Sequence, residues 1–302
     1  MHKKKFIVSS FYKFVYLDNP ESTKSELKKI LREFDVRGTF LIGKEGINSS
    51  FSISNDQYKI ATRKIEQLLS TEIIFKPQEH IEHSFLRLKI KIKKEIVTLG
   101  EGNINPKSLS GKHLNPRAWD KLIKNKNAII IDTRNTYESD IGSFKYSTKT
   151  CTTNFRDFPK WVKKNKNLLR NKEIGMFCTG GIRCEKASSY MINLGYKNVY
   201  QLDGGIINYL KETKNDHEMW QGECFVFDER ITLNKKLEQG SYSQCFACRS
   251  AITEKERKSK FFKSGVSCPK CYKEKSEKQR KRYEERQKQV LIAKKKGIKH
   301  LG

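Results

Sequence analysis

The chain has 302 residues, of which 36% are hydrophobic and 32% charged, and its formal net charge is +28. No apolar run approaches the ~20 residues of a membrane-spanning helix, which excludes an integral helical membrane protein, and we expect no membrane partner. The N-terminus places lysines before an apolar run, as a signal peptide does. Lys13 interrupts this run and no small-residue cleavage site follows it, so we expect a cytoplasmic protein.

Residues 1–97 predict a first domain of mixed α and β structure. Residues 6–16 alternate like a strand, residues 21–34 have helical spacing, and residues 38–54 read as two strands around a turn at 44–48. A second helix is predicted at 56–69 and a last strand at 85–92. The order βαββαβ is typical of a ferredoxin-like or acylphosphatase-like domain.

Residues 98–118 are rich in Gly and Pro and are predicted to be a linker. The next domain, 119–218, alternates apolar strands at 128–134, 173–178 and 198–205 with helices, one of them at 185–195. Such alternation predicts an α/β domain with a parallel sheet. Residues 219–244 are expected to form a connector. Residues 245–302 then form a cysteine-containing module with a basic helical tail.

The segment Cys178–Cys184, "CTGGIRC", follows a predicted buried strand and precedes a helix expected to begin near Cys184. Ligands bind at this edge of open α/β sheets. Gly180 and Gly181 let successive N–H groups converge, and the helix N-terminus adds partial positive charge. A thiol held there has a lowered pKa. We therefore predict that Cys178 is a nucleophile in an active loop completed by Thr179, Gly180, Gly181, Ile182 and Arg183.

The spacing of this loop separates two chemistries. A cysteine phosphatase has five residues between its cysteine and arginine, whereas four lie between Cys178 and Arg183. The tighter ring suits one sulfur atom better than a phosphate. The alternatives left are an incidental buried thiol and a metal site, and the second lacks a nearby His or Cys pair.

The motifs around this loop resemble a known family. "CTGGIRC" after "DTRNTYESDIGSF" is similar to a rhodanese domain, whose active loop opens with a persulfide-forming cysteine. The wider set resembles the rhodanese-containing tRNA uridine hydroxylases, which form 5-hydroxyuridine at the wobble position. That set comprises "GKEGIN", "KKEIVTLG", "IDTRNTYE", "FRDFPKWV", "FCTGGIRCEKASSYM", "YQLDGGI", "GECFVFDER" and "CFACRS…GVSCPKC".

The resemblance implies an enzyme with molecular oxygen as co-substrate, the anticodon region of tRNA as partner and Cys178 as the active cysteine, with a persulfide as one form of it. Four residues in or near the loop have open roles. Asp132 and Arg134 either position the cysteine or form a structural ion pair, with Glu138 as a candidate partner of Arg134. Arg183 either contacts substrate phosphate or braces the loop. Cys184 either begins the helix or acts as a resolving thiol.

Four cysteines near the C-terminus form two C-x2-C pairs: Cys245, Cys248, Cys268 and Cys271. Their spacing is that of a zinc site, and an all-thiolate set predicts a structural zinc. Unmetallated thiols or two disulfides are the alternatives. His80 and His83 have H-x-x-H spacing, but we place them in a loop and not in an iron site. No nucleotide-cofactor motif is evident.

Residues 245–302 contain 19 basic and 6 acidic residues, which favours a polyanionic partner such as tRNA. A solvated tail is the alternative for the helix that follows the cysteines. Three functions remain open from the sequence: a tRNA uridine hydroxylase, a rhodanese sulfurtransferase, and a non-catalytic RNA-binding protein.

Overall fold

The computed structural model describes residues 6–102, 104–213 and 218–297. The chain divides into two compact units. The first comprises residues 1–225 with 235–237, and the second comprises 226–234 with 238–302. Among the described residues, no helix is long and apolar enough to cross a membrane.

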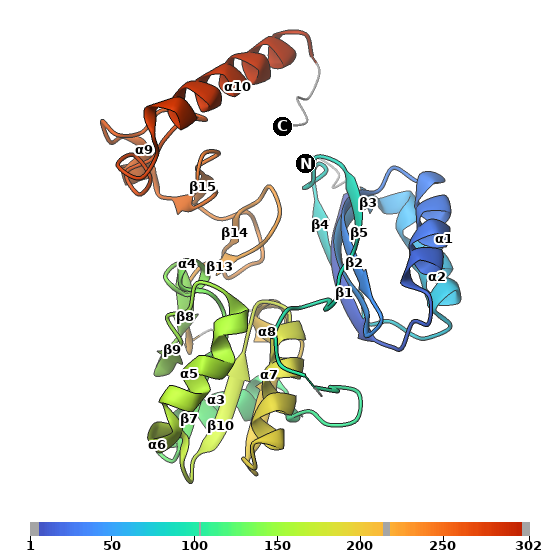
Figure 1. Cartoon of the computed structure of the whole chain (residues 1–302), viewed down its shortest axis with the longest axis vertical. Helices are drawn as coiled ribbons and strands as arrows, with labels where there is room; N and C mark the ends of the chain where they lie inside the picture. The colour runs from blue at the N-terminus through green and yellow to red at the C-terminus, as the bar shows by residue number, and fades with distance from the viewer. Residues whose placement is uncertain (1–5, 103, 214–217, 298–302) are drawn as a thin grey trace. The chain divides into compact units, whose positions relative to one another are not determined.

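The first domain of unit 1 is a five-stranded sheet with two helices. The strands are β1 Phe6–Phe14, β2 Arg37–Gly43, β3 Gly46–Ser54, β4 Lys76–His80 and β5 Leu88–Ile92, in the order β4-β1-β3-β2-β5. Helices α1 Pro20–Arg32 and α2 Asn55–Leu69 lie side by side on one face of the sheet (Figure 1). This arrangement confirms the acylphosphatase-like fold.

The strand at the end of this domain differs from the prediction. The predicted strand at 85–92 is β5, which pairs in parallel with β2 at the sheet edge, and the fourth strand of the fold is instead β4. The sequence of β4, "KPQEH", consists of a proline and four polar or charged residues, so it carries little strand signal. The prediction that His80 lies in a loop is therefore wrong, because His80 ends β4 and pairs with Phe6.

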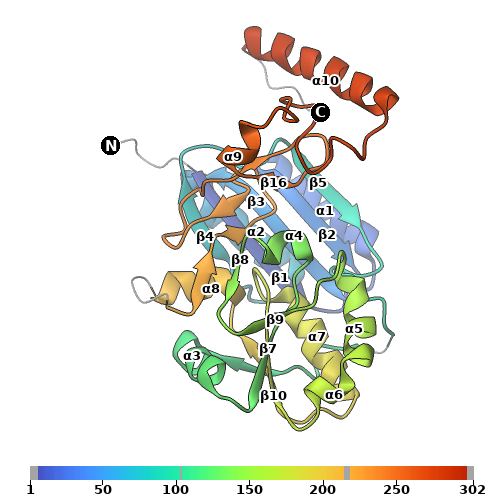
Figure 2. The ribbon, with the colours of Figure 1, turned by 90° about the vertical axis from the view of Figure 1, so that its left-hand side faces the viewer.

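The second domain of unit 1 is built on a parallel sheet. Its strands are β6 Lys112–Leu114, β7 Ala128–Asp132, β9 Ser147–Lys149, β10 Glu173–Phe177 and β11 Val199–Leu202, in the order β6-β11-β10-β7-β9. Helices α5 Phe158–Lys164, α6 Lys166–Leu169 and α7 Ile182–Asn193 lie on one side, and α3 Pro116–Lys124 and α8 Gly205–Thr213 on the other (Figure 2).

Both faces of this sheet are buried, which explains its continuous apolar strands. In β10, Ile174 and Met176 belong to the core cluster that includes residues of α5 and α7. Phe177 points to the opposite face, where its ring meets the ring of Trp119 from α3. Cys178 continues the alternation on the α7 side and is buried in the same cluster as Met176.

Short elements complete unit 1. They are α4 Thr136–Ser139, β8 Gly142–Phe144, a 3-10 turn at Phe155–Asp157, β12 Trp220–Gly222 and β13 Cys224–Phe225. Two ranges that were predicted to link domains contain paired strands. The range 98–118, predicted as a linker, contains β6, which pairs with β11. The range 219–244, predicted as a connector, begins with β12, which pairs with β8.

A buried lysine joins the two domains of unit 1. Lys186 of α7 is only 2% exposed, and its Nζ lies 2.8 Å from a carboxylate oxygen of Glu45 and 2.7 Å from one of Glu95. Both carboxylates come from the N-terminal part of the chain. A charge this deeply buried requires its partners, so this contact fixes the N-terminal domain beside α7.

Unit 2 is small and contains little regular structure apart from one long helix. Its elements are β14 Thr232–Leu233, β15 Ser243–Gln244, β16 Ala251–Ile252, α9 Glu254–Arg257 and α10 Glu277–Lys295. The buried cluster consists of Ile252 with Cys245, Cys268 and Cys271. Three of the four buried members of this cluster are therefore cysteines, while further buried apolar side chains of the unit, such as Leu233 and Val266, lie outside it.

Candidate active site and cysteine cluster

The active loop predicted from the sequence connects β10 to α7. Gly181 is the N-cap residue of α7 and has φ +101°, a conformation that favours glycine. The helix begins at Ile182, so Cys184 is its third residue and does not start it. The Sγ of Cys178 accepts a hydrogen bond from the N–H of Gly181 at 3.1 Å. The loop thus directs backbone donors at one sulfur, as its glycines predict.

The carbonyls of the same loop are held from outside. The N–H of Ile206 donates to the oxygen of Cys178 at 3.0 Å, and the N–H of Ile207 donates to that of Thr179 at 3.1 Å. Both donors come from the first turn of α8. Because these carbonyls are held by α8, the peptide units of the loop stay oriented with their N–H groups toward the sulfur.

Cys178 has a strongly lowered pKa despite its burial. Burial raises the pKa of this thiol, but the hydrogen bond from Cys184, the charge of Arg183 and the backbone N–H groups of Arg183 and Cys184 together lower it to about 5. Cys178 is 1% exposed. At neutral pH it is therefore a thiolate held in a cradle of donors, which is the state in which cysteine acts as a nucleophile.

Cys184 has the opposite character. Burial and the neighbouring Cys178 raise the pKa of the Cys184 thiol well above its usual range. Its Sγ lies 3.7 Å from the Oγ1 of Thr133. Cys184 is therefore a protonated thiol that donates to the thiolate beside it. This pairing gives the two cysteines of the loop different roles at neutral pH.

Arg183 is held by a buried carboxylate. Its two terminal nitrogens donate to the two carboxylate oxygens of Glu138, both at 2.7 Å, and the Glu138 side chain is fully buried. Thr179 lies near the same carboxylate, with 3.4 Å between its Oγ1 and Glu138 Oε1. A bidentate pair of this kind braces the loop. It occupies the face of Arg183 that a substrate phosphate would need.

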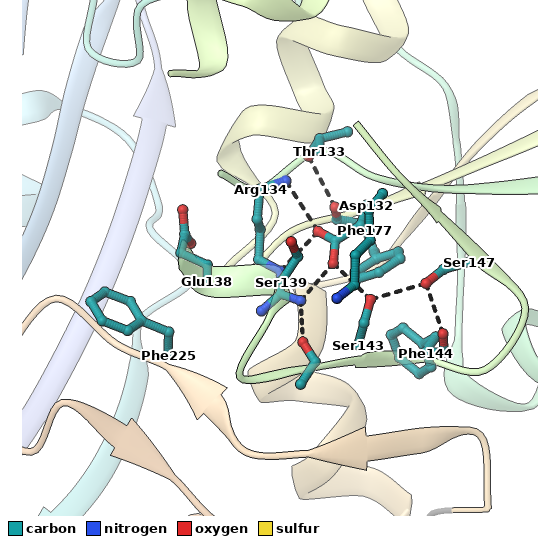
Figure 3. A network of polar contacts seen from close by, with 12 residues as sticks. Asp132, Thr133, Arg134, Glu138, Ser139, Ser143, Phe144, Ser147, Phe177 and Phe225 are labelled. Atoms are coloured by element: carbon teal, nitrogen blue, oxygen red, sulfur yellow. Dashed lines mark hydrogen bonds and ion pairs between the residues drawn. The ribbon is translucent and has the colours of Figure 1, made fainter. Parts of the chain in front are cut away.

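Asp132 and Arg134 form a separate ion pair (Figure 3). The Nε and Nη2 atoms of Arg134 donate to the two oxygens of Asp132 at 2.9 and 2.6 Å, and Nη2 also donates to the oxygen of Gly142. Both side chains are fully buried. Glu138 is therefore the partner of Arg183, and the suggestion that it pairs with Arg134 is wrong.

Thr133, between these two residues, contacts the loop although the sequence analysis did not single it out. Its Oγ1 donates to the oxygen of Phe177 at 2.9 Å, and its N–H donates to the same oxygen at 3.1 Å (Figure 3). Phe177 directly precedes Cys178. The only signal for Thr133 in the sequence is its place at the end of a strand beside β10.

Three further residues at the loop were missed. Gly205 has φ +71°, and a Cβ at this position would lie 2.5 Å from the oxygen of Cys178. Lys76 of β4 donates through Nζ to the oxygens of Gly180 and Gly204. Tyr12 of β1 donates to Glu185 at 3.0 Å. The "GG" after β11 is a sequence signal for Gly205, whereas nothing in the sequence connects Lys76 or Tyr12 to a loop more than 100 residues away.

A cavity of about 380 Å³ lies beside these contacts, between the N-terminal domain and α8. Its lining includes Tyr12, Lys13, Lys76, His113, Glu185 and Lys211. His113 Nε2 lies 3.0 Å from Glu185 Oε1, and this contact raises the pKa of His113. The cavity thus carries several basic groups next to the active loop.

The four cysteines of unit 2 meet at one point. All four sulfurs lie within 4.8 Å of one another, with separations of 3.9 Å for Cys245–Cys271, 3.7 Å for Cys248–Cys268 and 3.8 Å for Cys268–Cys271. A tetrahedron with Zn–S bonds of about 2.3 Å has edges of about 3.8 Å. The cluster can therefore hold a metal ion, and its geometry fits zinc.

The two histidines singled out by their spacing make separate contacts. His83 is buried, with Nδ1 2.9 Å from the Oγ of Ser52 and Nε2 2.9 Å from a carboxylate oxygen of Asp35. His80 contacts the backbone of Glu82 instead. Their roles in the described structure are contacts within the N-terminal domain.

Comparison with known families identifies both domains of unit 1. Residues 6–96 match the UPF0176 acylphosphatase-like domain, and residues 115–212 match the rhodanese-like domain. The order of these two domains matches the architecture of the family that the sequence resembles.

Three solved structures that are similar to part of this chain each cover about a third of it. A protein of unknown function from Rhodopseudomonas palustris, described as a possible tyrosine phosphatase, is 21% identical. The alignment covers 34% of this chain and 81% of that one, with a TM-score of 0.30. A rhodanese-related protein from Thermoplasma volcanium is 25% identical over 33% and 92% of the two chains, with a TM-score of 0.28. A rhodanese-like domain from Anabaena is 14% identical over 38% and 80%, with a TM-score of 0.30.

Proposed function

This chain is a rhodanese-type protein that joins a UPF0176 acylphosphatase-like domain to a rhodanese-like domain, and from that premise we propose that it is a tRNA-modifying enzyme. The proposed reaction is oxygen-dependent hydroxylation of uridine 34 at C5, which gives 5-hydroxyuridine. The observation that carries the proposal is the buried Cys178 thiolate, which accepts hydrogen bonds from backbone donors. It is an activated nucleophile in a chain whose domain order is that of the rhodanese-containing tRNA uridine hydroxylases.

The chemistry requires one oxygen atom from O2 to enter C5 while the other leaves as water, with two electrons supplied by a reductant. A thiolate can serve this reaction in two ways. Added to C6 of the uracil ring, Cys178 would make C5 nucleophilic toward an oxygen donor. As a persulfide, Cys178 would itself carry or activate the oxygen. Both routes require the deprotonated sulfur that the low pKa of Cys178 provides.

The tRNA partner is proposed on the basis of charge. The cavity beside the loop is lined by Lys13, Lys211 and His113 but also by Asp203, Glu185 and Glu212, so the main positive charge is the large basic excess of residues 245–302. Phosphate contacts supply much of the affinity of proteins for nucleic acids. Basic groups next to a nucleophile are the arrangement that a polyanionic substrate needs.

A second candidate function is sulfur transfer, and the same loop supports it. A persulfide on Cys178 would accept hydrogen bonds from the N–H groups that now point at its sulfur. The Cys178 thiolate would take its outer sulfur from a sulfane-sulfur donor such as thiosulfate, which leaves as sulfite. Transfer of that sulfur to an acceptor thiol or to tRNA would then regenerate the Cys178 thiolate.

The test is nucleoside mass spectrometry of tRNA from a deletion strain complemented with wild-type protein, Cys178→Ser or Cys151→Ser. Cys151 is an exposed cysteine of the same domain and serves as the control. We expect 5-hydroxyuridine with the wild type and Cys151→Ser, and at least a 100-fold loss with Cys178→Ser, since a nucleophile is removed. Loss of a thiolated base instead would support sulfur transfer. Full hydroxylation in Cys178→Ser would refute the proposal.

A further inference from the structure

Lys76 lies in the N-terminal domain but binds the active loop of the rhodanese domain. It belongs to β4, and its Nζ donates to the oxygens of Gly180 and Gly204. Gly180 is within the loop, and Gly204 directly precedes α8, whose first N–H groups hold the loop from the other side. Among the described residues, Lys76 is therefore the one cation of the N-terminal domain whose side chain donates to this loop.

The contact reaches the nucleophile through a single peptide unit. The oxygen of Gly180 and the N–H of Gly181 belong to the same amide group. Lys76 donates to the oxygen, and the N–H donates to Cys178 Sγ at 3.1 Å. A cation on the oxygen of an amide draws electron density from its nitrogen, so the N–H becomes a stronger donor. The chain from Lys76 to the thiolate is thus a cooperative pair of hydrogen bonds.

The surroundings hold Lys76 in this position. Its Nζ lies 5.2 Å from the centre of the Tyr12 ring, and the Tyr12 hydroxyl is tied to Glu185 on α7. A Cβ on residue 181 would lie 2.9 Å from the hydroxyl oxygen of Tyr12 and would displace it. Glycine at this position therefore leaves room for Tyr12. Burial lowers the pKa of Lys76, while Cys178, Asp203 and Glu185 act to raise it.

We infer that Lys76 is a positioning residue for Cys178: by holding the oxygen of Gly180, it keeps the N–H of Gly181 on the sulfur and stabilises the thiolate. The N-terminal domain thereby completes the nucleophile site of the rhodanese domain. This inference rests on the part of the proposed function that makes Cys178 the reacting group.

Other ionisable groups also act on this sulfur, and the experiment must keep them unchanged. Those that interact with Cys178 are Tyr12 on β1, Arg183 and Cys184 on α7, and Cys224 on β13. Glu138 on α4 acts through Arg183. Substitution of Lys76 removes none of these groups, so a change in the pKa of Cys178 reports on Lys76.

The experiment measures the pKa of Cys178 in the full-length chain. The rate of its alkylation by iodoacetamide is followed by peptide mass spectrometry from pH 4 to 9. Cysteine ¹³Cβ NMR gives the same pKa without requiring the reagent to reach the sulfur. The variants are Lys76→Met, Lys76→Gln, Lys76→Arg and Lys13→Met. Lys13 is the matched control, because it lines the same cavity and, among the described residues, no hydrogen bond or ion pair joins its side chain to the loop.

We expect the pKa of Cys178 to be about 5 in the wild type and to rise by about one unit or more in Lys76→Met, which makes the thiolate-to-thiol ratio roughly tenfold smaller at any given pH. Lys76→Arg should stay near the wild type and Lys13→Met should match it. If Lys76→Met does not fold, the comparison of Lys76→Gln with Lys76→Arg decides, with the higher pKa expected for Gln. Equal pKa values in the uncharged variants and the wild type would overturn the inference.

The outcome is separate from that of the proposed function. The pKa of Cys178 requires neither tRNA nor oxygen, so a shift in Lys76→Met stands even if Cys178→Ser retains 5-hydroxyuridine. In the reverse case, an unchanged pKa removes Lys76 from the site while Cys178 keeps its proposed role in the reaction.

Discussion

The buried pair of Arg183 and Glu138 connects the active loop to the segment that follows β7. Arg183 is the last loop residue before Cys184, and Glu138 lies 45 residues earlier, on α4. Each charge is removed from water, so each depends on the other. The charge of Arg183 also lowers the pKa of Cys178. A single ion pair therefore contributes both to the position of the loop and to the ionisation of its thiol.

Replacement of Glu138 by Gln should strongly destabilise the rhodanese domain. Gln keeps the size of the side chain but leaves Arg183 as an unpaired buried charge, which costs about 3–5 kcal/mol. Chemical denaturation followed by tryptophan fluorescence measures the loss. The control is Asp140→Asn, which breaks the exposed pair of Asp140 with Lys149 and should cost less than about 1 kcal/mol. A similar small loss in both variants would contradict this account.

At the residue scale, the sequence predicts the strand–loop–helix surroundings of Cys178 because the residues that form them are local. The strand, the glycine pair and the following helix all lie within a few residues of it. The partner of Arg183 was not predictable in the same way. Asp132, Arg134 and Glu138 are close together in the sequence, and only the fold shows that Arg134 turns to Asp132 while Glu138 meets Arg183.

At the scale of elements, the first turn of α8 supports the active loop from outside. Its N–H groups hold the oxygens of Cys178 and Thr179, and Gly205 brings its backbone close enough to do so. A Cβ on Gly205 would also lie 2.8 Å from the nitrogen of Gly181, which is the donor to Cys178 Sγ. All of these neighbours are backbone atoms, so they have no rotamer with which to make room.

Replacement of Gly205 by Ala should displace the loop and raise the pKa of Cys178. We expect a loss of about 1–3 kcal/mol in stability from overpacking and strain, and alkylation of Cys178 that begins at a higher pH. Gly195→Ala is the matched control. Gly195 has φ +92°, but a Cβ there meets no atom within 4 Å. Gly195→Ala should therefore lose only about 1 kcal/mol and leave the pKa unchanged. Equal pKa shifts in both variants would show that backbone strain, not contact with the loop, is the cause.

Strand β4 illustrates why one side of the site was missed. Its sequence does not alternate, and it contains Pro77 in a strand at the edge of the sheet. It is a strand because β1 offers it a pairing edge, with Phe6 opposite His80 and Ser10 opposite Lys76. This is a tertiary effect that strand propensity does not contain. Lys76 reaches the active loop only because β4 forms, so its role was equally hidden.

At the scale of the whole molecule, the two units differ in what stabilises them. Unit 1 contains two large apolar clusters, one in each of its domains. The buried cluster around the cysteines of unit 2 consists of Ile252 and three cysteines, and outside it the unit buries a few more apolar side chains, such as Leu233 and Val266. Such a cluster buries too little apolar surface to offset the loss of chain entropy on folding. Spacing alone was sufficient to predict that these four cysteines gather into a group that could hold a metal ion, because each C-x2-C pair is local and only the two pairs have to meet.

We predict that unit 2 folds only around zinc. Elemental analysis should find about one zinc per chain in the wild type, none in Cys268→Ser and one in the Cys151→Ser control. Removal of the metal by a chelator should increase amide hydrogen exchange across residues 243–272 by at least 100-fold, since binding and folding of such sites are coupled. Exchange in β7 and β10 should stay unchanged, because their core contains no part of the cluster. Protection of residues 243–272 that survives chelation would instead mean that Ile252 and its neighbours suffice as a core, and the four cysteines would then have to be retained for a reason other than stability.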